Sequence, residues 1–306
     1  MQDNSPHIPV LLQHVIEQSN LREGDSVIDG TIGFGGHALA LLNIIGNSGK
    51  YLGIDKDEKA LDYCKNHICN PSLILAKGMF GEIDQIAAEN NFSSVNFILL
   101  DLGVSSVQLD DASYGLSFLS TGALDMRIGV NGKSAADIIN NWTAKELKQL
   151  FTENGQEGTN RLVDKIISER QKNRIKTVEQ LRTLIESVVP YKHGINPSTK
   201  VFQALRIEAN DEFGQLMAGL AKSTDLLAKG GRIVVISFHS GEDKIVKNFF
   251  RNEALDCICP SNMPVCQCNH KASLQIITKS PIIAGEKEIK GNPRSRSAKM
   301  RVAEKI

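Results

Sequence analysis

Residues 29–37 read Asp29-Gly30-Thr31-Ile32-Gly33-Phe34-Gly35-Gly36-His37. This stretch directly follows the apolar residues Val27 and Ile28, and the next apolar stretch, Tyr51 to Ile54, ends in a single acid, Asp55. Glycines permit a tight strand-to-helix turn that brings backbone against a ligand, and an acid about 20 residues further on can accept hydrogen bonds from ribose hydroxyls. The two features together predict a site for a nucleotide-like cofactor.

Two cofactors compete for this site. A nicotinamide dinucleotide would seat its pyrophosphate on the helix N-terminus, and Ala38 is permitted at the third glycine position. Asp29 would repel that pyrophosphate, whereas the sulfonium and ammonium groups of S-adenosylmethionine (AdoMet) gain from a nearby carboxylate. The methyltransferase pattern acid-x-Gly-x-Gly-x-Gly is matched at Asp29, Gly33 and Gly35, with Thr31 at the first glycine. AdoMet is favoured, and a dehydrogenase site or a turn without a ligand remains as an alternative.

The composition is typical of a globular protein. The chain has 306 residues, of which 41% are apolar and 23% charged. No apolar run reaches the roughly 18 residues of a membrane span, and Met1 to His7 lack the features of a secretory signal. We therefore expect a cytoplasmic protein without a membrane partner.

The charge is balanced overall but not locally. The 35 basic and 35 acidic residues cancel, yet Arg161 to Arg206 carries ten Lys or Arg against four Asp or Glu. From Glu286 to Ile306 the count is seven against three. These segments either contact phosphates or are solvated helix and tail surfaces, and composition does not separate the two interpretations.

Four of the six cysteines are crowded into two pairs, Cys257-x-Cys259 and Cys266-x-Cys268, with His270 close behind. Disulfides are disfavoured in the cytosol, which makes zinc the alternative to free thiols. One residue between paired cysteines is expected to strain a shared tetrahedral site. We therefore take free thiols as the default, assign no metal site, and leave metal binding open.

Short apolar runs alternate with amphipathic segments in the first hundred residues, which predicts repeated βα units and a parallel, doubly wound sheet. The predicted strands are 26–29, 51–55, 73–76, 95–101 and 232–237, with a weaker pair at 274–278 and 299–303. The predicted helices are 36–45, 57–67, 82–90 and 211–229, the last ending before Gly230-Gly231.

The pattern changes between Leu102 and Asn210. A Gly-, Ser- and Asp-rich loop runs to about Gly132, and helices follow at 134–139, 143–151, 161–170 and 178–189. Roughly a hundred residues is too long for one βα connection. We expect an inserted all-helical substrate-binding domain at 109–210, within a domain formed by 1–108 and 211–306.

Candidate chemical groups follow two of the predicted strands. Asp101 ends the fourth strand, with Ser105 and Gln108 after it, and its carboxylate can accept a hydrogen bond from an amine held in line with a methyl group. Phe238 and His239 follow the fifth strand and suit a flat base swung out of its strand. The structural alternatives are an Asx-capped turn at Asp101 and, since Glu242 and Asp243 follow, a helix start after His239. Phe80 either covers an adenine ring or belongs to the core.

Six ordered motifs carry a family resemblance. They closely resemble the bacterial 16S ribosomal RNA cytosine-N4 methyltransferase family and span nearly the whole chain: 29–37, 101–110, Leu124-Asp-Met-Arg127, Phe202-Gln-Ala-Leu-Arg-Ile207, Ile236-Ser-Phe-His-Ser240 and Asn292-Pro-Arg-Ser-Arg-Ser-Ala298, with His7-Ile-Pro-Val-Leu-Leu12 resembling the start.

The resemblance implies a class I, Rossmann-like AdoMet-dependent methyltransferase with an inserted helical domain. It implies methylation of the exocyclic N4 of a cytidine in the decoding centre, with 16S rRNA or the small ribosomal subunit as partner; a homodimer is left open. The implied AdoMet contacts are Gly35, Gly36, His37, Asp55, Phe80, Asp101 and Gln108. The expected catalytic set is Asp101 as acceptor or positioner of the amine, with Ser105, Phe238 and His239 around the cytosine.

The chain departs from the family pattern where RNA is expected to bind. The departures are Tyr114, Leu116, Ile128, Ser198, Lys200, Gly241 and Lys244. Lys does not replace a bidentate Arg contact, so these changes bear on substrate affinity and target choice. They permit a second function, a non-catalytic ribosome-assembly factor that retains AdoMet.

Overall fold

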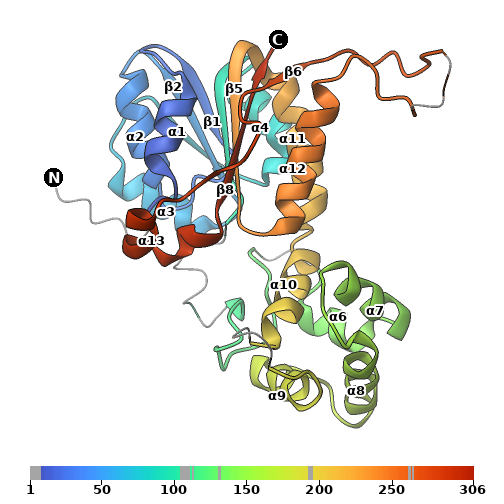
Figure 1. The fold of residues 1–306 in the computed structure, drawn as a ribbon. Coiled ribbons are helices and arrows are strands. Elements are labelled where there is room, and N and C mark those ends of the chain that lie inside the picture. Colours follow the sequence, from blue (N-terminus) through green and yellow to red (C-terminus); the bar gives the residue numbers. More distant parts are fainter. Residues whose placement is uncertain are drawn as a thin grey trace. The chain divides into compact units, whose positions relative to one another are not determined.

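The computed structural model describes residues 8–103, 111, 114–129, 132–191, 196–260, 263 and 265–306. The chain divides into two compact units (Figure 1). The first unit comprises Met1–Gly103 and Phe213–Ile306, and the second comprises Val104–Glu212. Each unit is built around its own core, so each is described by itself.

The first unit is built on one mixed sheet with strand order β3-β2-β1-β4-β5-β8-β6, and β7 pairs with β8. Five strands are parallel: β1 (Ser26–Asp29), β2 (Lys50–Asp55), β3 (Leu73–Lys77), β4 (Val95–Asp101) and β5 (Leu227–Ser237). The predicted parallel sheet is confirmed for these strands. On the other side of β5 the sheet is antiparallel, through β8 (Lys299–Lys305), β6 (Leu274–Ile276) and β7 (Ile282–Ile283).

One boundary was wrong. The helix expected over 211–229 ends at Leu226, and β5 begins at once with Leu227. Leu227 pairs with Val95 across a register shift, so the strand starts before the glycine pair that was expected to separate it from the helix. Gly230, which was expected to mark the end of the helix, lies inside β5 with φ +79. Pairing of β5 with β4 therefore outweighs the helix-ending preference of the glycine pair.

Apolar side chains of β4 are buried on both faces of the sheet. Phe97 and Leu99 enter one core cluster, while Ile98 and Leu100 enter the other, as the alternation of a strand requires. The first cluster includes side chains of α1 (Leu12–Ser19), α2 (Gly36–Ile45) and α3 (Glu58–His67). The second includes side chains of α4 (Ile83–Glu89), α11 (Glu212–Leu226) and α12 (Ser240–Glu253), which cover the opposite face (Figure 1). The three-layer arrangement explains why β4 reads as a continuous apolar run.

Parallel pairing brings the carboxyl ends of the central strands to one edge. Asp29 of β1 is in register with Gly53 of β2 and Leu99 of β4, and Asp101 of β4 with Ile236 of β5. The residues that follow these strands therefore share one edge of the sheet, where ligands of open α/β sheets bind. The remaining short elements of this unit are η1 (Phe80–Glu82), α13 (Glu286–Gly291) and η3 (Pro293–Ser297).

The second unit is helical around a core of its own. Its helices are α6 (Ala135–Asn141), α7 (Ala144–Glu153), α8 (Thr159–Lys172), α9 (Val178–Val188) and α10 (Ser198–Ala209). Capping boxes start three of them, at Ser134, Thr143 and Thr177, each with its partner three residues on. The helix α10 was not predicted, although Val201, Phe202 and Leu205 are buried in this core. Within the described ranges no helix is both long and apolar enough to cross a membrane.

Candidate active site

The glycine-rich turn after β1 is held against the end of β2. The Gly33 amide donates to Asp55 Oδ2 at 2.9 Å, and the Gly30 amide donates to the Leu99 carbonyl at 2.9 Å. Gly35 has φ +78, and a Cβ there would overlap the Ile68 side chain and lie 3.2 Å from Cys64 Sγ. The turn therefore needs glycine at position 35 for both its backbone angle and its space. A Cβ at Gly36, the first residue of α2, would lie 3.1 Å from the Pro9 ring.

Asp55 is positioned by two backbone amides. Its Oδ2 accepts from Gly33, and its Oδ1 accepts from the Asp57 amide at 2.9 Å. Burial raises the pKa of Asp55, while these two hydrogen bonds lower it. Each carboxylate oxygen offers a second lone pair. Asp55 thus keeps the capacity to accept hydrogen bonds from ribose hydroxyls.

Both carboxylate oxygens of Asp29 are hydrogen-bonded inside the protein. Its side chain is buried, with Oδ1 accepting from the Thr31 amide at 3.1 Å and Oδ2 from the Tyr51 hydroxyl at 2.9 Å. Burial raises the pKa of Asp29 to about 7. A cation close to this edge would favour the ionised carboxylate.

Asp101 lies at the carboxyl end of β4, with its side chain partly exposed. Its amide donates to Thr31 Oγ1 at 2.7 Å, which fixes the end of β4 against the glycine-rich turn. Its side chain keeps 14% of its surface exposed, and its Oδ1 finds no hydrogen-bond partner within the described part of the chain. Burial, followed by the negative charge of Asp29 and then that of Glu242, raises the pKa of Asp101 to about 7, against the lowering effect of a hydrogen bond from the Gly103 backbone. An unsatisfied buried carboxylate oxygen is costly, so this atom is suited to a ligand that donates a hydrogen bond or carries positive charge.

His37 lies beside Asp101. Its Nδ1 is 3.8 Å from Asp101 Oδ2, and its Nε2 is 3.0 Å from the Val10 carbonyl. The imidazole, 7% exposed, thus connects the N-terminal segment to the carboxyl end of β4.

Phe238 lies over the backbone that follows Asp101. A Cβ at Gly103 would be only 2.7 Å from Phe238 Cε2, so glycine at 103 is what admits the ring. Glu242, which is 3% exposed, holds the segment: its Oε2 accepts from the Phe238 and His239 amides at 2.8 and 3.2 Å. Neither Gly103 nor Glu242 was predicted as a site residue, although a glycine two residues after the strand acid was a readable signal.

His239 has a structural task in α12. It is the N-cap of that helix, its Nδ1 accepts from the Glu242 amide at 3.4 Å, and its Nε2 lies 3.1 Å from Glu242 Oε1. The nearby departure Gly241 also has a local explanation. A Cβ there would lie 2.8 Å from Phe213 Cζ, so the Phe213 ring occupies the space of a side chain at 241.

Phe80 borders both the turn and the core. A Cβ at Gly219 of α11 would lie 2.6 Å from Phe80 Cδ2, and one at Gly30 would lie 3.0 Å from Phe80 Cβ. The ring is partly buried against the second core cluster. Two other predicted site residues, Ser105 and Gln108, lie outside the described residues.

The raised pKa values predict how stability of the cofactor-free protein depends on pH. Asp29 and Asp101 titrate near 7 when folded and near 3.8 when unfolded, so between these values the folded protein holds protons that the unfolded chain has released. The two protonated carboxyls therefore stabilise the folded protein fully below the unfolded pKa of 3.8, and this stabilisation is lost as pH rises towards 7. We expect the melting temperature, measured by calorimetry across this range, to fall with rising pH, and to fall less in Asp101→Asn. An equal slope in both proteins would contradict the assignment.

The sheet edge thus combines a glycine-rich turn, an acid with remaining acceptor capacity and a concentration of carboxylates. This combination, on a Rossmann-like fold, is typical of an AdoMet-dependent methyltransferase. The chain belongs to the MraW methylase family, whose model matches residues 4–306. When bound, AdoMet supplies a methyl group made electrophilic by the positive sulfur.

The chain is similar over nearly its whole length to proteins named ribosomal RNA small subunit methyltransferase H. The relative from Caldicellulosiruptor saccharolyticus is 42% identical over 98% of this chain and 99% of its own length. That from Dehalococcoides mccartyi is 43% identical over 98% and 87%. That from Solidesulfovibrio magneticus is 40% identical over 100% and 97%.

Proposed function

We propose that this chain transfers the methyl group of AdoMet to the exocyclic N4 amine of a cytidine in 16S rRNA, in the decoding centre of the small ribosomal subunit. The observation that carries the proposal is Asp101, whose Oδ1 is buried, unpartnered among the described residues and placed at the sheet edge beside the glycine-rich turn. The names of the relatives, which specify small-subunit ribosomal RNA, support the substrate class.

Asp101 can activate the amine that is methylated in this reaction. The lone pair of a cytosine N4 is conjugated with the ring, so the amine is a weak nucleophile until an acceptor polarises an N–H bond. The Asp101 carboxylate accepts that hydrogen bond and takes the proton that leaves N4 as the new carbon–nitrogen bond forms. A base with a pKa of about 7 is matched to this task near neutral pH.

The cofactor is proposed to bind at the same edge. Gly35, Gly36 and His37 bind the methionine end, and Asp55 binds the ribose. Phe80, Asp101 and Gln108 complete the predicted cofactor contacts. The Phe238 ring, packed on Gly103, offers a flat face on which a flipped cytosine stacks. Ser105, which lies outside the described residues, and His239 complete the predicted set of residues around the cytosine.

The helical unit is proposed to bind the RNA. Arg161, Lys172, Arg174 and Lys176 are exposed on α8 and the segment after it. Exposed cations of this kind neutralise phosphates and release counterions. The family motif at 124–127 instead serves local structure, because Arg127 Nε donates to Asp125 Oδ1 at 2.6 Å and Asn210 donates to the Met126 carbonyl at 2.8 Å.

A labelling experiment tests the proposal. Small subunits from a strain that lacks the activity are incubated with this protein and tritiated AdoMet, alongside protein-free 16S rRNA and fully methylated subunits. We expect label to appear on one cytidine of the undermethylated subunits, as N4-methylcytidine after nuclease digestion, and none on the methylated subunits. AdoMet binding without label would indicate a non-catalytic assembly factor, and label on another atom or base would overturn the N4 assignment.

A further inference from the structure

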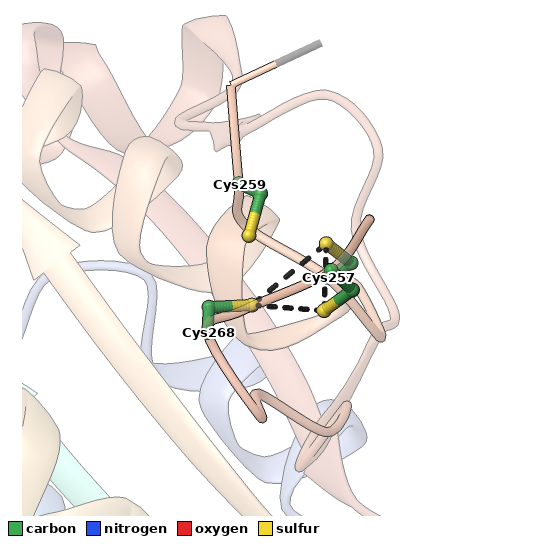
Figure 2. A group of neighbouring side chains, drawn as sticks. Cys257, Cys259 and Cys268 are labelled. Atoms are coloured by element: carbon green, nitrogen blue, oxygen red, sulfur yellow. Dashed lines mark hydrogen bonds between the residues drawn. The ribbon is translucent and has the colours of Figure 1, made fainter. Parts of the chain in front are cut away.

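The segment between α12 and β6 brings four cysteine side chains together (Figure 2). The Sγ atoms of Cys257, Cys259, Cys266 and Cys268 all lie within 4.8 Å of one another. Cys257 and Cys266 are exposed, and Cys259 and Cys268 are half-buried. The cluster belongs to the first unit but has no part in the site described above.

Three of the sulfurs are spaced like one face of a tetrahedron around an ion, and Cys259 Sγ lies within 4.8 Å of each of them. With a Zn–S bond of about 2.3 Å, tetrahedral geometry places the sulfurs about 3.8 Å apart. The Sγ distances are 3.4 Å for Cys257–Cys266, 3.6 Å for Cys266–Cys268 and 3.7 Å for Cys257–Cys268. One residue between paired cysteines was expected to strain a shared site. The 3.6 Å between Cys266 and Cys268 shows that a Cys-x-Cys pair here can bring both sulfurs to the spacing of one shared ion.

Backbone amides support the sulfurs in a reciprocal pattern. The Ile258 amide, between the first two cysteines, donates to Cys268 Sγ at 3.5 Å. The Gln267 amide, between the second two, donates to Cys259 Sγ at 3.4 Å. Amide hydrogen bonds stabilise thiolates and orient metal ligands. Each Cys-x-Cys segment thus donates a backbone hydrogen bond to a sulfur of the other segment.

Other uses of the cluster fit less well. All four cysteines are free thiols, and the sulfur separations far exceed the roughly 2.05 Å of a disulfide. His270 Nε2 lies 3.0 Å from the Asn252 carbonyl of α12, so it is used outside the cluster. An iron–sulfur cluster would spread its cysteines over several iron atoms, whereas these four sulfurs all lie within 4.8 Å of one another.

We propose that Cys257, Cys259, Cys266 and Cys268 bind one zinc ion as a closed, structural site. Four thiolates fill a tetrahedral shell, which leaves no open position for catalysis. The ion holds Cys257 and Cys259 to Cys266 and Cys268, which closes the chain between the two pairs into a loop, and its binding releases the thiol protons. Zinc binds thiolate ligands well and has no redox chemistry, which suits an ion that only stabilises structure.

Cobalt substitution tests the site without reference to methyl transfer. The full chain, reduced and freed of metal, is titrated with Co²⁺ and then with Zn²⁺. We expect one equivalent of Co²⁺ to produce the visible bands of a tetrahedral tetrathiolate ion, and Zn²⁺ to bleach them. Cys268→Ser should lower zinc affinity at least a hundredfold, while Cys69→Ser, at an exposed cysteine outside the cluster, should bind as wild type does. Failure of the reduced wild type to bind either ion, or equal binding by Cys268→Ser, would overturn the proposal.

Limited proteolysis provides a second readout. Lys271 is exposed just after the cluster, where trypsin can reach it. We expect removal of zinc by a chelator to accelerate cleavage after Lys271 in the wild type and in Cys69→Ser, and to leave the already faster cleavage of Cys268→Ser unchanged. If intact-mass measurement instead finds two disulfides in protein purified under reducing conditions, the cluster is a redox element and the zinc assignment fails.

Discussion

Replacing Asp101 with Asn is expected to lower the rate of methyl transfer by roughly 10²- to 10⁴-fold, the range for loss of a general base. Asn keeps the shape of the side chain but can no longer accept a proton. Single-turnover labelling of undermethylated small subunits measures this rate, with AdoMet saturating so that weaker cofactor binding does not enter. Asp62→Asn, on an exposed turn of α3, is the matched control and should leave the rate unchanged.

The pH profile separates the role of Asp101 in chemistry from a role in structure. The wild-type rate should rise with pH as Asp101 ionises, with a midpoint near 7 in the free protein that moves lower when the cationic cofactor is bound. Asp101→Asn should lose this dependence. A variant that keeps the full rate, or an unchanged profile at a reduced rate, would contradict proton acceptance by Asp101.

Replacing Gly35 with Ala is expected to weaken AdoMet binding at least tenfold and to destabilise the protein by about 2–4 kcal/mol. The backbone at φ +78 costs a side-chain-bearing residue about 1 kcal/mol, and the overlap with Ile68 adds about 1–3 kcal/mol. Calorimetric titration with AdoMet and denaturant unfolding measure the two effects.

Gly230→Ala is the control for backbone angle alone. Gly230 has φ +79, close to that of Gly35, but no atom lies within 4 Å of the position its Cβ would take. We expect Gly230→Ala to lose only the stability that the positive φ costs a residue with a side chain, about 1 kcal/mol. It should bind AdoMet as wild type does. Equal loss of AdoMet affinity in Gly35→Ala and Gly230→Ala would contradict the prediction that overlap with Ile68 weakens AdoMet binding.

The core of the fold was predictable because its signals are local. The apolar residues of β4, the glycine-rich turn and the spacing between strands indicate βα units wherever they occur. The first four parallel strands lie within one residue of their expected bounds, and the fifth contains its expected residues but begins earlier. The start of β5 was not predictable, because Leu227 is drawn into the sheet by Val95, a residue far away in the chain. The helix α10 was missed although its start carries a signal: Asn196 precedes Pro197, and Asn196 Oδ1 accepts from the Ser198 amide at 2.8 Å.

The sequence by itself determined the alternating strands and helices of the first hundred residues and placed Asp29, Asp55 and Asp101 at strand ends, since these follow from periodicity and spacing. Only the tertiary structure decided how each group is used. It bonds Asp29 to Tyr51, leaves Asp101 Oδ1 without a partner in the described chain, admits Phe238 over Gly103, and brings four cysteine sulfurs within 4.8 Å of one another. The reason is physical: hydrogen-bond satisfaction, burial and charge–charge distances depend on residues far apart in the chain, and those distances exist only after folding.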